Sequence, residues 1–497
     1  MVSINSDAAR VAPPNFVNRE HELAELRALA DRYEPALALL YGRRRVGKTY
    51  LLDHAWPDRR VFYFLAGNTT LEANRQELLR ELTPFVADPR DVDPEERPTW
   101  RSVFRLLADL AAEAPLIVVL DEFQNLLHEG GAVASDLMAV WDREVKNRPL
   151  MLVACGSEVG TMASLESASG PLFGRWNWTA RLKPFDYFNA ARMLPGRDLR
   201  ERTMAYGMLG GTPRYLATVQ PGDDLATRIT QAVLSPRGEV HVQLDRLMDQ
   251  EQGIRDAAEY RAVLTAIAGG HTTLQAIASA TGRSDRVHTV RRTAGILEDL
   301  GWVRHESNYA AHRRAVARYR IGDPALRFWY RFVYPNRSRL ERGDAAAVWR
   351  SEVQPNLGTF MGAAFEEVAV QALRRRHSHP EGWPVKQTAR WEGRAKNGRS
   401  VEIDLVAELE GGRILTGEFK WSSRPVGVKV HHHLLRNLED LAESGQGWAR
   451  DARAGTRSAG FLYVSAAGFA PDMLDAARHD PRIHLLTLAD LYDGLDV

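Results

Sequence analysis

Gly42-Arg-Arg-Arg-Val-Gly-Lys-Thr49 decides the fold of the first part of this 497-residue chain. The stretch fits the pattern G-x-x-x-x-G-K-[ST], in which a glycine-rich turn directs backbone N–H groups toward phosphates. It follows the apolar run Ala36–Tyr41 and precedes the helical pattern Tyr50–Ala55. This is the strand–loop–helix context that the motif requires. The sequence therefore predicts a P-loop that binds ATP with Mg²⁺.

The residues of this loop form the predicted nucleotide-binding set. Lys48 is expected to reach the β- and γ-phosphates, and the Thr49 hydroxyl to ligate Mg²⁺. The helix that follows adds the positive end of its dipole. The consecutive arginines either help to hold phosphate or are simply solvated. The full set is Gly42, Arg43, Arg44, Arg45, Val46, Gly47, Lys48 and Thr49.

A second apolar run, Leu116–Leu120, ends in an acidic pair. Such a run predicts a strand buried on both faces, and open α/β sheets place ligands at the carboxyl ends of their strands. We expect Asp121 to hold Mg²⁺ through water and Glu122 to orient or polarise the attacking water. A third run, Leu150–Ala154, leads to Ser157, which either senses the γ-phosphate or belongs to an ordinary loop.

Composition limits the classes of protein. Hydrophobic residues make up 44% and charged residues 26% of the chain, as in ordinary globular proteins. The net charge of +1 means that any contact with nucleic acid must come from local basic patches. One cysteine, Cys155, excludes a disulfide framework. The first 16 residues lack the pattern of a signal peptide, and no apolar run approaches a membrane span. We therefore expect a cytoplasmic protein.

Five segments follow one another in the first 220 residues: Phe16–Leu23, the P-loop, Leu120-Asp-Glu122, Pro171–Arg175 and Gly210–Leu216. Together they resemble the archaeal and bacterial AAA+-related ATPases close to the STAND group. The resemblance implies that the Asn-Arg-Glu box of the first segment flanks the adenine and that the Gly-Gly-Thr-Pro-Arg part of the last belongs to a lid. It further implies that Pro213 or Arg214 contacts the nucleotide, and that Arg175 is a candidate for γ-phosphate charge, from the same chain or a neighbour. The alternative for both arginines is a solvated or salt-bridged side chain.

From Tyr260 the pattern changes to short helices followed by two strands around a basic hairpin. The pattern resembles a winged helix-turn-helix, which would place its third helix in the DNA major groove and wing arginines on phosphates. The alternative is a packing and regulatory module. The third helix has the apolar stripe Val287, Val290, Ala294 and Leu297, and its open face carries Arg286, His288, Thr289, Arg292 and Thr293, with Arg291 at the edge of the stripe. The strands are Trp302–His305 and Ala317–Ile321, and the hairpin carries His312, Arg313, Arg314 and Arg318.

Carboxylates and a lysine recur near the C-terminus. In the alternating stretch Ser400–Ala407, Asp404 lies on the polar face, and the next strand carries Glu418 and Lys420. A hairpin would bring these three side chains together, with Glu366 approaching from an upstream helix. Carboxylate oxygens suit Mg²⁺, which activates water and stabilises charge on a phosphodiester. Lys420 would orient that water or offset developing negative charge.

This helix–Asp–Glu-x-Lys order resembles the PD-(D/E)xK nuclease superfamily over residues 360–470. The resemblance implies catalytic roles for Asp404, Glu418 and Lys420, and metal ligation by Glu366, Asp404 and Glu418. Two alternatives stay open: a binding module without cleavage, and a solvent-exposed face with Glu–Lys pairing. The run His431–His433 is interpreted as solvated surface, because consecutive histidines on a regular element cannot all face one ion.

Together these patterns predict an α/β P-loop NTPase of AAA+-like type with a helical lid, a winged helix-turn-helix and a C-terminal α/β restriction-endonuclease-like domain. The leading functional hypothesis is an ATPase that couples nucleotide state to DNA binding or metal-dependent DNA cleavage. A STAND-like switch and a transcription regulator are the alternatives, and a homo-oligomer is a further candidate assembly. The expected boundaries are 1–185 for the ATPase core, 186–250 for the lid, 251–322 for the winged helix, 323–352 for a linker and 353–497 for the nuclease-like domain.

Overall fold

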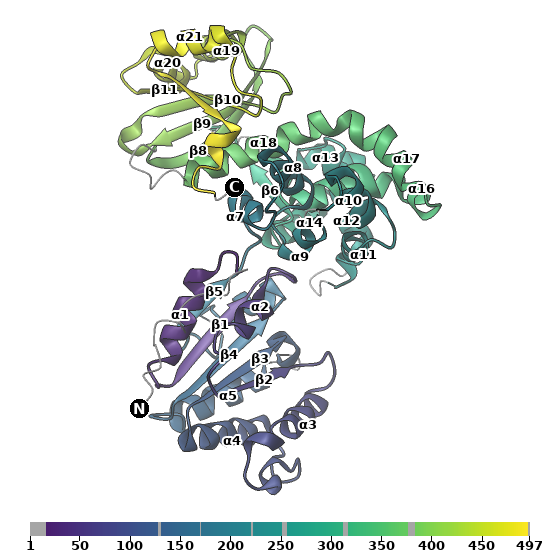
Figure 1. Ribbon diagram of the computed structural model, residues 1–497, viewed down its shortest axis with the longest axis vertical. Helices are drawn as coiled ribbons and strands as arrows, with labels where there is room; N and C mark the ends of the chain where they lie inside the picture. Colours follow the sequence, from purple (N-terminus) through teal and green to yellow (C-terminus); the bar gives the residue numbers. More distant parts are fainter. Residues whose placement is uncertain are drawn as a thin grey trace. The chain divides into compact units, whose positions relative to one another are not determined.

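The computed structural model describes residues 16–127, 131–168, 170–219, 222–250, 256–311, 317–375 and 383–495. The chain divides into two compact units, Met1–Pro184 and Phe185–Val497, which Figure 1 draws in one colour sequence. The segment inspected for a signal peptide lies outside the described residues, apart from Phe16. The hairpin residues His312, Arg313 and Arg314 also lie outside them.

A five-stranded parallel sheet forms the centre of the first unit, with strand order β2-β3-β4-β1-β5. This confirms the predicted parallel α/β fold. Four strands coincide with the apolar runs of the sequence, whereas β5 is short, partly exposed and paired only at the sheet edge, so no such run marks it. The strands are β1 (Ala36–Tyr41), β2 (Val61–Leu65), β3 (Leu116–Asp121), β4 (Leu150–Gly156) and β5 (Trp178–Arg181).

Helices cover both faces of this sheet (Figure 1). Alternate residues of one strand face opposite cores: Leu40 packs with α1 and α2, and Leu39 packs with α3, α4 and α5. Burial on both faces fixes the carboxyl edge of the sheet, where the P-loop begins. The helices are α1 (Glu20–Ala30), α2 (Lys48–Asp53), α3 (Leu71–Glu81), α4 (Trp100–Glu113), α5 (Ala132–Arg143) and α6 (Val159–Ser164).

The second unit begins with short helices and continues into three helices and a two-stranded antiparallel sheet. These last elements lie where the sequence predicted three helices and two strands. The first set is α7 (Tyr187–Arg192), α8 (Leu199–Leu209), α9 (Pro213–Leu216), α10 (Leu225–Ile229) and α11 (Glu239–Asp245). The second set is α12 (Ala257–Ala268), α13 (Leu274–Ala280), α14 (Val287–Asp299), β6 (Val303–Glu306) and β7 (Arg318–Ile321).

The stretch expected to be a linker, 323–352, is helical instead. It contains α15 (Pro324–Phe328), α16 (Arg337–Glu341) and α17 (Ala345–Val348), joined by further helical turns, and leads into α18 (Gln354–Arg375). The expectation was wrong because this segment carries its own apolar core: Phe328, Trp329 and Phe332 are buried.

A second five-stranded sheet, with order β12-β11-β10-β9-β8, ends the chain. The β9–β10 hairpin is antiparallel with Leu405 opposite Gly417, whereas β10, β11 and β12 run parallel. The strands are β8 (Val385–Arg394), β9 (Ser400–Leu409), β10 (Ile414–Lys420), β11 (Ser458–Ser465) and β12 (Ile483–Thr487). Its helices are α19 (Lys429–Glu443), α20 (Gly447–Ala454), α21 (Pro471–His479) and α22 (Leu488–Leu491).

The interpretation of His431–His433 as solvated surface was wrong for one residue. His431 is buried and its Nδ1 lies 2.8 Å from the Tyr463 hydroxyl, because the amphipathic helix α19 turns this side chain toward the sheet. His432 and His433 are exposed. Within the described parts of the chain, no helix combines the length and apolar character needed to cross a bilayer.

Gly211 tests the packing at the start of the second unit. A Cβ atom added there would lie 1.8 Å from the Phe185 carbonyl oxygen. We expect Gly211→Ala to destabilise the protein by about 1–3 kcal/mol through overpacking, seen as a lower melting temperature by circular dichroism. Gly295→Ala is the matched control, because its Cβ meets no atom within 4 Å and helical Gly→Ala stabilises by about 0.5–1 kcal/mol. Equal melting temperatures for the two variants would contradict this packing.

Candidate functional site

The P-loop adopts a backbone that its glycines make accessible. Gly47 has φ of +97°, a region that L side chains rarely adopt. A Cβ at Gly42 would lie 2.2 Å from the Leu182 carbonyl oxygen. Arg45 is also left-handed, with φ of +69°, which is uncommon outside glycine and marks a constrained turn. The loop therefore passes directly into α2, whose N-terminal N–H groups suit an anion.

The Lys48 side chain lies folded back within this loop. Its ammonium donates to the carbonyl oxygens of Gly42 at 2.7 Å and Arg43 at 3.3 Å. Burial lowers the pKa of Lys48, while the charges of Asp121 and Glu122 act in the opposite direction. A positive charge held inside a ring of backbone groups is ready to receive a phosphate.

Asp121 lies beside the P-loop at the carboxyl end of β3. The Thr49 hydroxyl is 3.5 Å from Asp121 Oδ2, and the Glu122 N–H donates to Oδ1 at 2.8 Å. The Tyr63 hydroxyl, from the neighbouring strand β2, also donates to Asp121. Thus the two predicted Mg²⁺ residues, Thr49 and Asp121, meet. Tyr63 was missed because no motif marks it; the strand pairing alone brings it there.

Glu122 takes a left-handed conformation, with φ of +50°, and its carboxylate belongs to a polar network. It accepts a hydrogen bond from the Ser157 hydroxyl at 2.6 Å and another from the Gln124 amide. The Arg44 Nε donates to the same Ser157 hydroxyl at 3.4 Å. The structure therefore joins the P-loop, β3 and β4 through Ser157. Gln124 was missed by sequence reasoning, although its position two residues after Glu122 was the available signal.

The two arginines proposed for γ-phosphate and lid roles are both paired. Arg175 forms a two-pronged ion pair with Asp142, at 2.9 and 2.7 Å. Arg214, in the second unit, pairs with Glu239, and Pro213 begins α9 beside it. Either guanidinium would have to leave its carboxylate to contact a nucleotide. Cys155 is buried and burial raises its pKa, as expected for an inert core thiol.

In the second unit, the β9–β10 hairpin brings Asp404, Glu418 and Lys420 together. The Lys420 ammonium lies 2.6 Å from Glu418 Oε2 and 3.2 Å from Asp404 Oδ2, and the Phe419 N–H donates to Asp404 at 2.9 Å. Burial and the Asp404 charge raise the pKa of Glu418. Burial opposes the charged form of Lys420, but the two carboxylates outweigh it and raise the pKa of this lysine.

Glu366, on α18, faces the same region from another side. It lies 3.6 Å from Arg390 Nη1, and burial together with the Asp404 charge raises its pKa. The cavity that Glu366 lines is also lined by Asp404. Among the described residues, however, no three His, Cys, Asp or Glu side chains form a group that could hold a metal ion. Glu366, Asp404 and Glu418 therefore lie in the same region, but their carboxylates are not arranged as three ligands of one metal ion.

The residues of this cluster nonetheless suit a hard cation in kind. Glu418 Oε1 is buried and has no hydrogen-bond partner within the described structure, and a buried unsatisfied carboxylate oxygen is costly. Carboxylate oxygens are the ligands that Mg²⁺ prefers. The donor chemistry therefore fits a divalent cation, with Lys420 as the charge that balances the carboxylates in its absence.

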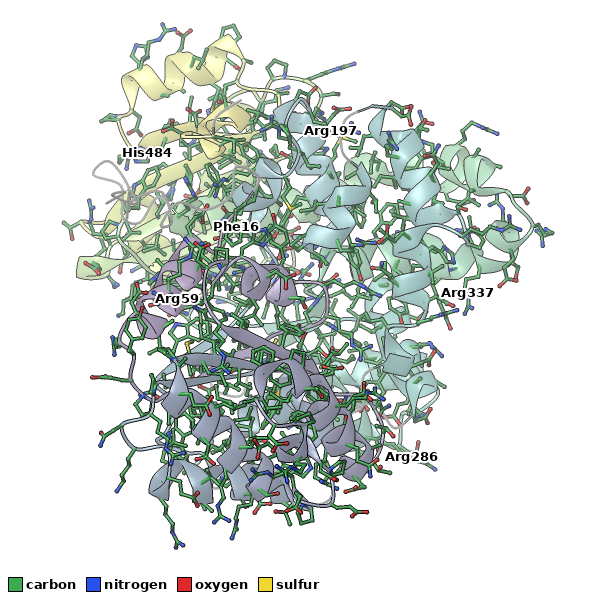
Figure 2. All side chains as sticks on the ribbon, turned by 60° about the horizontal axis from the view of Figure 1, so that its bottom comes forward. Phe16, Arg59, Arg197, Arg286, Arg337 and His484 are labelled. Carbon is green, nitrogen blue, oxygen red and sulfur yellow. The ribbon has the colours of Figure 1, made fainter. Side chains whose placement is uncertain are left out.

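Helix α14, the third of the three helices in the segment α12–β7, is amphipathic. Val290, Ala294 and Leu297 are fully buried, whereas Arg286, His288, Arg291, Arg292 and, at the end of the helix, Asp299 are exposed; Figure 2 labels Arg286 at the start of the helix. Placing Thr293 on the open face was wrong: it is buried, and its hydroxyl donates to Glu259 of α12. The Thr293 hydroxyl thus adds a hydrogen bond to the contact between α14 and α12, beside the buried apolar residues.

Comparison with known proteins agrees with the description of the N-terminal part of the chain. Residues 16–219 match a family model described as an ATPase domain predominantly from Archaea. Residues 329–432 match a model of archaeal and bacterial proteins of unknown function. The first match confirms that the N-terminal part is a P-loop ATPase domain that takes ATP. The predicted P-loop ATPase domain is thus confirmed, and the roles of its individual residues stay predictions.

Individual relatives are distant. An uncharacterized protein of Methanocaldococcus jannaschii is 27% identical over 414 residues, which are 82% of this chain and 87% of the relative. The Walker-type ATPase of Pyrococcus abyssi is similar with a TM-score of 0.47 and 22% identity, over 65% of this chain and 99% of that one. The ORC2 protein of Aeropyrum pernix has a TM-score of 0.45 and 14% identity, over 67% and 97% of the two chains.

Lys48 provides the first test of the nucleotide site. We expect Lys48→Ala to abolish ATP binding, because Lys48 is the only lysine of the P-loop and the predicted ligand of the β- and γ-phosphates. Binding of a fluorescent ATP analogue by the full-length protein measures this. Lys183→Ala, which removes a lysine elsewhere in the same unit, is the control and should bind normally. Normal binding by Lys48→Ala would refute the assignment of the loop.

Glu122→Gln separates hydrolysis from binding. The amide keeps the shape of the side chain and its contact with Ser157 but cannot accept a proton from water. We expect the rate of phosphate release to fall by about 10²–10⁴-fold, the usual contribution of a general base, while ATP affinity is retained. An unchanged hydrolysis rate would remove Glu122 from the mechanism.

Proposed function

We propose that this chain is an ATP-dependent, Mg²⁺-requiring enzyme that processes DNA, in which the nucleotide state of the ATPase domain controls cleavage by the C-terminal sheet domain. One observation carries the proposal. Asp404, Glu418 and Lys420 meet on adjacent strands, and helices from the end of the ATPase-type segment pack against the same region.

That packing supplies a physical route between the two activities. Residues 185–219 fall within the ATPase match but belong to the second unit. There α8 packs on α18, where Gln371 donates to the Tyr206 hydroxyl at 2.9 Å. The Arg200 guanidinium lies 4.2 Å from the centre of the Trp421 ring and donates to the Ser422 carbonyl at 3.1 Å.

Trp421 stands next to both parts of the proposed cleavage site. It follows Lys420 directly in the chain, and its ring lies 5.3 Å from that of Phe365, the neighbour of Glu366. A movement of α8 would therefore press on the residues beside Lys420 and Glu366. Nucleotide-driven movement of a packed helix is a common way to transmit a change of state. In this proposal ATP drives a change of shape, and Arg214 or Pro213 in the lid senses the nucleotide.

The cleavage chemistry would rest on a divalent cation held by Asp404 and Glu418, with Glu366 as the third carboxylate. When bound, such an ion lowers the pKa of a water ligand and stabilises charge on phosphate oxygens. Asp404 and Lys420 would act beside this ion. Asp404 is fixed by the Phe419 N–H, and Lys420, freed from the carboxylates, places a positive charge near the phosphodiester.

DNA contact is proposed for the segment α12–β7, which has the element order of a winged helix-turn-helix. The exposed arginines of α14 are suited to the phosphates or base edges of a major groove. Its buried Thr293 and apolar stripe hold the helix to α12 and leave those arginines free to face outward.

A regulatory switch that binds but does not cleave is the second candidate. It is favoured by the direct pairing of Lys420 with Asp404 and with one oxygen of Glu418, and by the absence of a three-ligand group among the described residues. Metal-dependent digestion of plasmid and single-stranded DNA separates the two candidates. A transcription regulator would instead show site-specific binding that survives removal of residues after about Asp344.

Asp404→Ala and Lys420→Ala test the cleavage proposal. Each is expected to lower Mg²⁺-dependent cleavage by about 10²-fold or more, the scale of losing one charge-stabilising group, while leaving the rate of ATP hydrolysis unchanged. Melting curves by circular dichroism show whether each variant is folded, because the ATPase site lies in the first unit and both substitutions lie in the second. Lys386→Ala is the control, since Lys386 is an exposed lysine of β8 paired with Glu408. Cleavage by both variants at the wild-type rate would refute the proposed site.

A further inference from the structure

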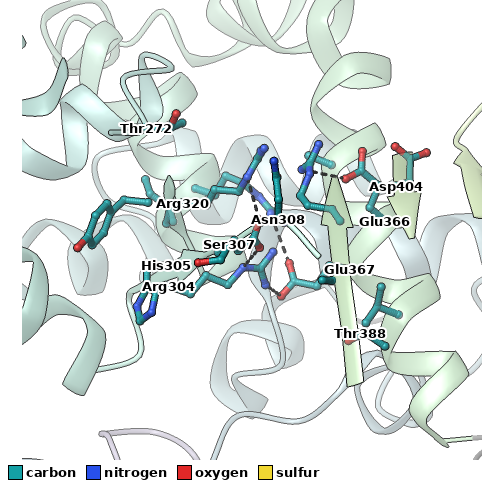
Figure 3. Close-up of a pocket in the computed structure, with 18 of the residues that line it drawn as sticks. Thr272, Arg304, His305, Ser307, Asn308, Arg320, Glu366, Glu367, Thr388 and Asp404 are labelled. Atoms are coloured by element: carbon teal, nitrogen blue, oxygen red, sulfur yellow. Dashed lines mark hydrogen bonds and ion pairs between the residues drawn. The ribbon is translucent and has the colours of Figure 1, made fainter. Parts of the chain in front are cut away.

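A cavity of about 690 Å³ lies in the second unit between the β6–β7 hairpin, α18 and β8. Figure 3 shows Glu366 and Asp404 on one side of it and Thr272 and His305 on the other, with Arg304 and Arg320 between them. Two of the proposed metal residues thus face the interior of a bounded space. The shape of that space limits what can reach them.

The lining is strongly charged and largely self-paired. Arg304 bonds to Glu367 at 2.9 Å, Arg327 lies 3.4 Å from the same carboxylate, and Arg390 lies 3.6 Å from Glu366. Arg374 differs: its guanidinium donates to the Thr388 hydroxyl at 2.6 Å and has no carboxylate partner in the described structure. Arg374 therefore offers the cavity a positive charge that no acid among the described residues pairs with.

The hairpin wall of the cavity is fastened to the sheet. The Asn308 side chain donates to the Glu392 carbonyl at 2.9 Å and accepts from the Glu392 N–H at 3.0 Å. The Tyr309 N–H donates to the Arg390 carbonyl at 2.9 Å. The Tyr309 ring is buried in the C-terminal core, 5.3 Å from the Trp448 ring. The segment after β6 thus extends the edge of β8 and closes the cavity on that side.

We propose that this cavity is a binding site for single-stranded nucleic acid, as a free strand or an unpaired end, and that the docked hairpin keeps duplex out of it. The inference rests on the proposed function for the identity of the ligand as a nucleic acid. The volume of the cavity lies in the range of small-molecule pockets, about 300–1,000 Å³. Such a volume suits a few nucleotides. Basic side chains that follow a sugar–phosphate strand are typical of single-strand sites.

The arrangement also gives the lining residues distinct tasks. Arg374 is placed to hold a phosphate, while the Thr388 hydroxyl to which it donates keeps its guanidinium at the cavity wall. Polar groups such as Gln387 and Ser307 line the same space and can meet base edges or sugar hydroxyls. A strand held in this way would pass by Glu366 and Asp404.

The test is binding of end-labelled oligonucleotides to the full-length protein in EDTA, followed by fluorescence anisotropy. The probes are a DNA single strand, the blunt duplex of the same sequence, the duplex with a single-stranded overhang, and the RNA single strand. We expect the single strand and the overhang to bind about tenfold or more tighter than the blunt duplex. The comparison of the two single strands distinguishes DNA from RNA without affecting the inference. Because the arginines of α14 are proposed to bind duplex, the comparison is made on the part of the binding that Arg374→Ala removes. An equal loss for blunt duplex and for single strand would overturn the inference.

Arg374→Ala connects the binding to this cavity. It should weaken binding of the single strand several-fold and reduce the slope of log affinity against log salt by about 0.7, the value for one phosphate contact on a single strand. Lys386→Ala removes one positive charge from the same neighbourhood, but Lys386 does not line the cavity, and its salt slope should match that of the wild type. The same slope for Arg374→Ala as for the wild type would place the binding elsewhere.

Asn308→Ala tests whether the docked β6–β7 hairpin excludes duplex from the cavity. Loss of its two bonds to the Glu392 backbone should loosen the hairpin and narrow the difference in affinity between single strand and blunt duplex. An unchanged difference would show that the hairpin does not exclude duplex. These outcomes are distinct from failure of the proposed function: a protein that binds single strands in EDTA but never cleaves them with Mg²⁺ refutes the cleavage site alone. Efficient cleavage of blunt duplex refutes the single-strand inference alone.

Discussion

The nucleotide site depends on parallel strands that end at one edge of a buried sheet. β1 delivers the P-loop, β3 delivers Asp121 and Glu122, and β4, which pairs with both, delivers Ser157. Because both faces of the sheet are covered, these ends cannot shift independently. The hydrogen bonds from Arg44 and Gln124 to Ser157 show how closely the three strand ends are tied. A change at any one of them reaches the others through this hydroxyl.

The boundary of the ATPase-type segment does not coincide with the boundary of the compact units. The family match runs to residue 219, yet the chain joins the second unit from Phe185 onward. The lid segment is therefore covalently part of the ATPase domain and physically part of the body that holds Asp404 and Lys420. The proposed coupling would then need no long pathway, because a displacement of α8 would act on Trp421 through Arg200.

Periodicity and motif spacing were enough to predict four strands of the first sheet, and to place the P-loop and Asp121 at its carboxyl edge. They also predicted the β9–β10 hairpin, since Val401 and Ile403 are buried while Glu402 is exposed. They failed where tertiary packing overrides local pattern. The aromatic segment after Asp323 became a helical core, and His431 turned inward. Sequence reasoning also missed Tyr63, Gln124 and Arg374, because each owes its position to an element far along the chain or to a turn that carries no motif.

The docking of the hairpin bears on two roles that the sequence left open for it. A wing that contacts DNA must be free to follow the phosphate backbone, but Asn308 and Tyr309 are engaged with β8 through backbone bonds and a buried ring. Freeing them would expose the Tyr309 ring and leave the edge of β8 unpaired, which is unfavourable. The described part of the hairpin therefore favours a packing role between α12–α14 and the C-terminal sheet. In the proposed function, duplex contact would then fall to the exposed arginines of α14 and not to the docked residues of the hairpin.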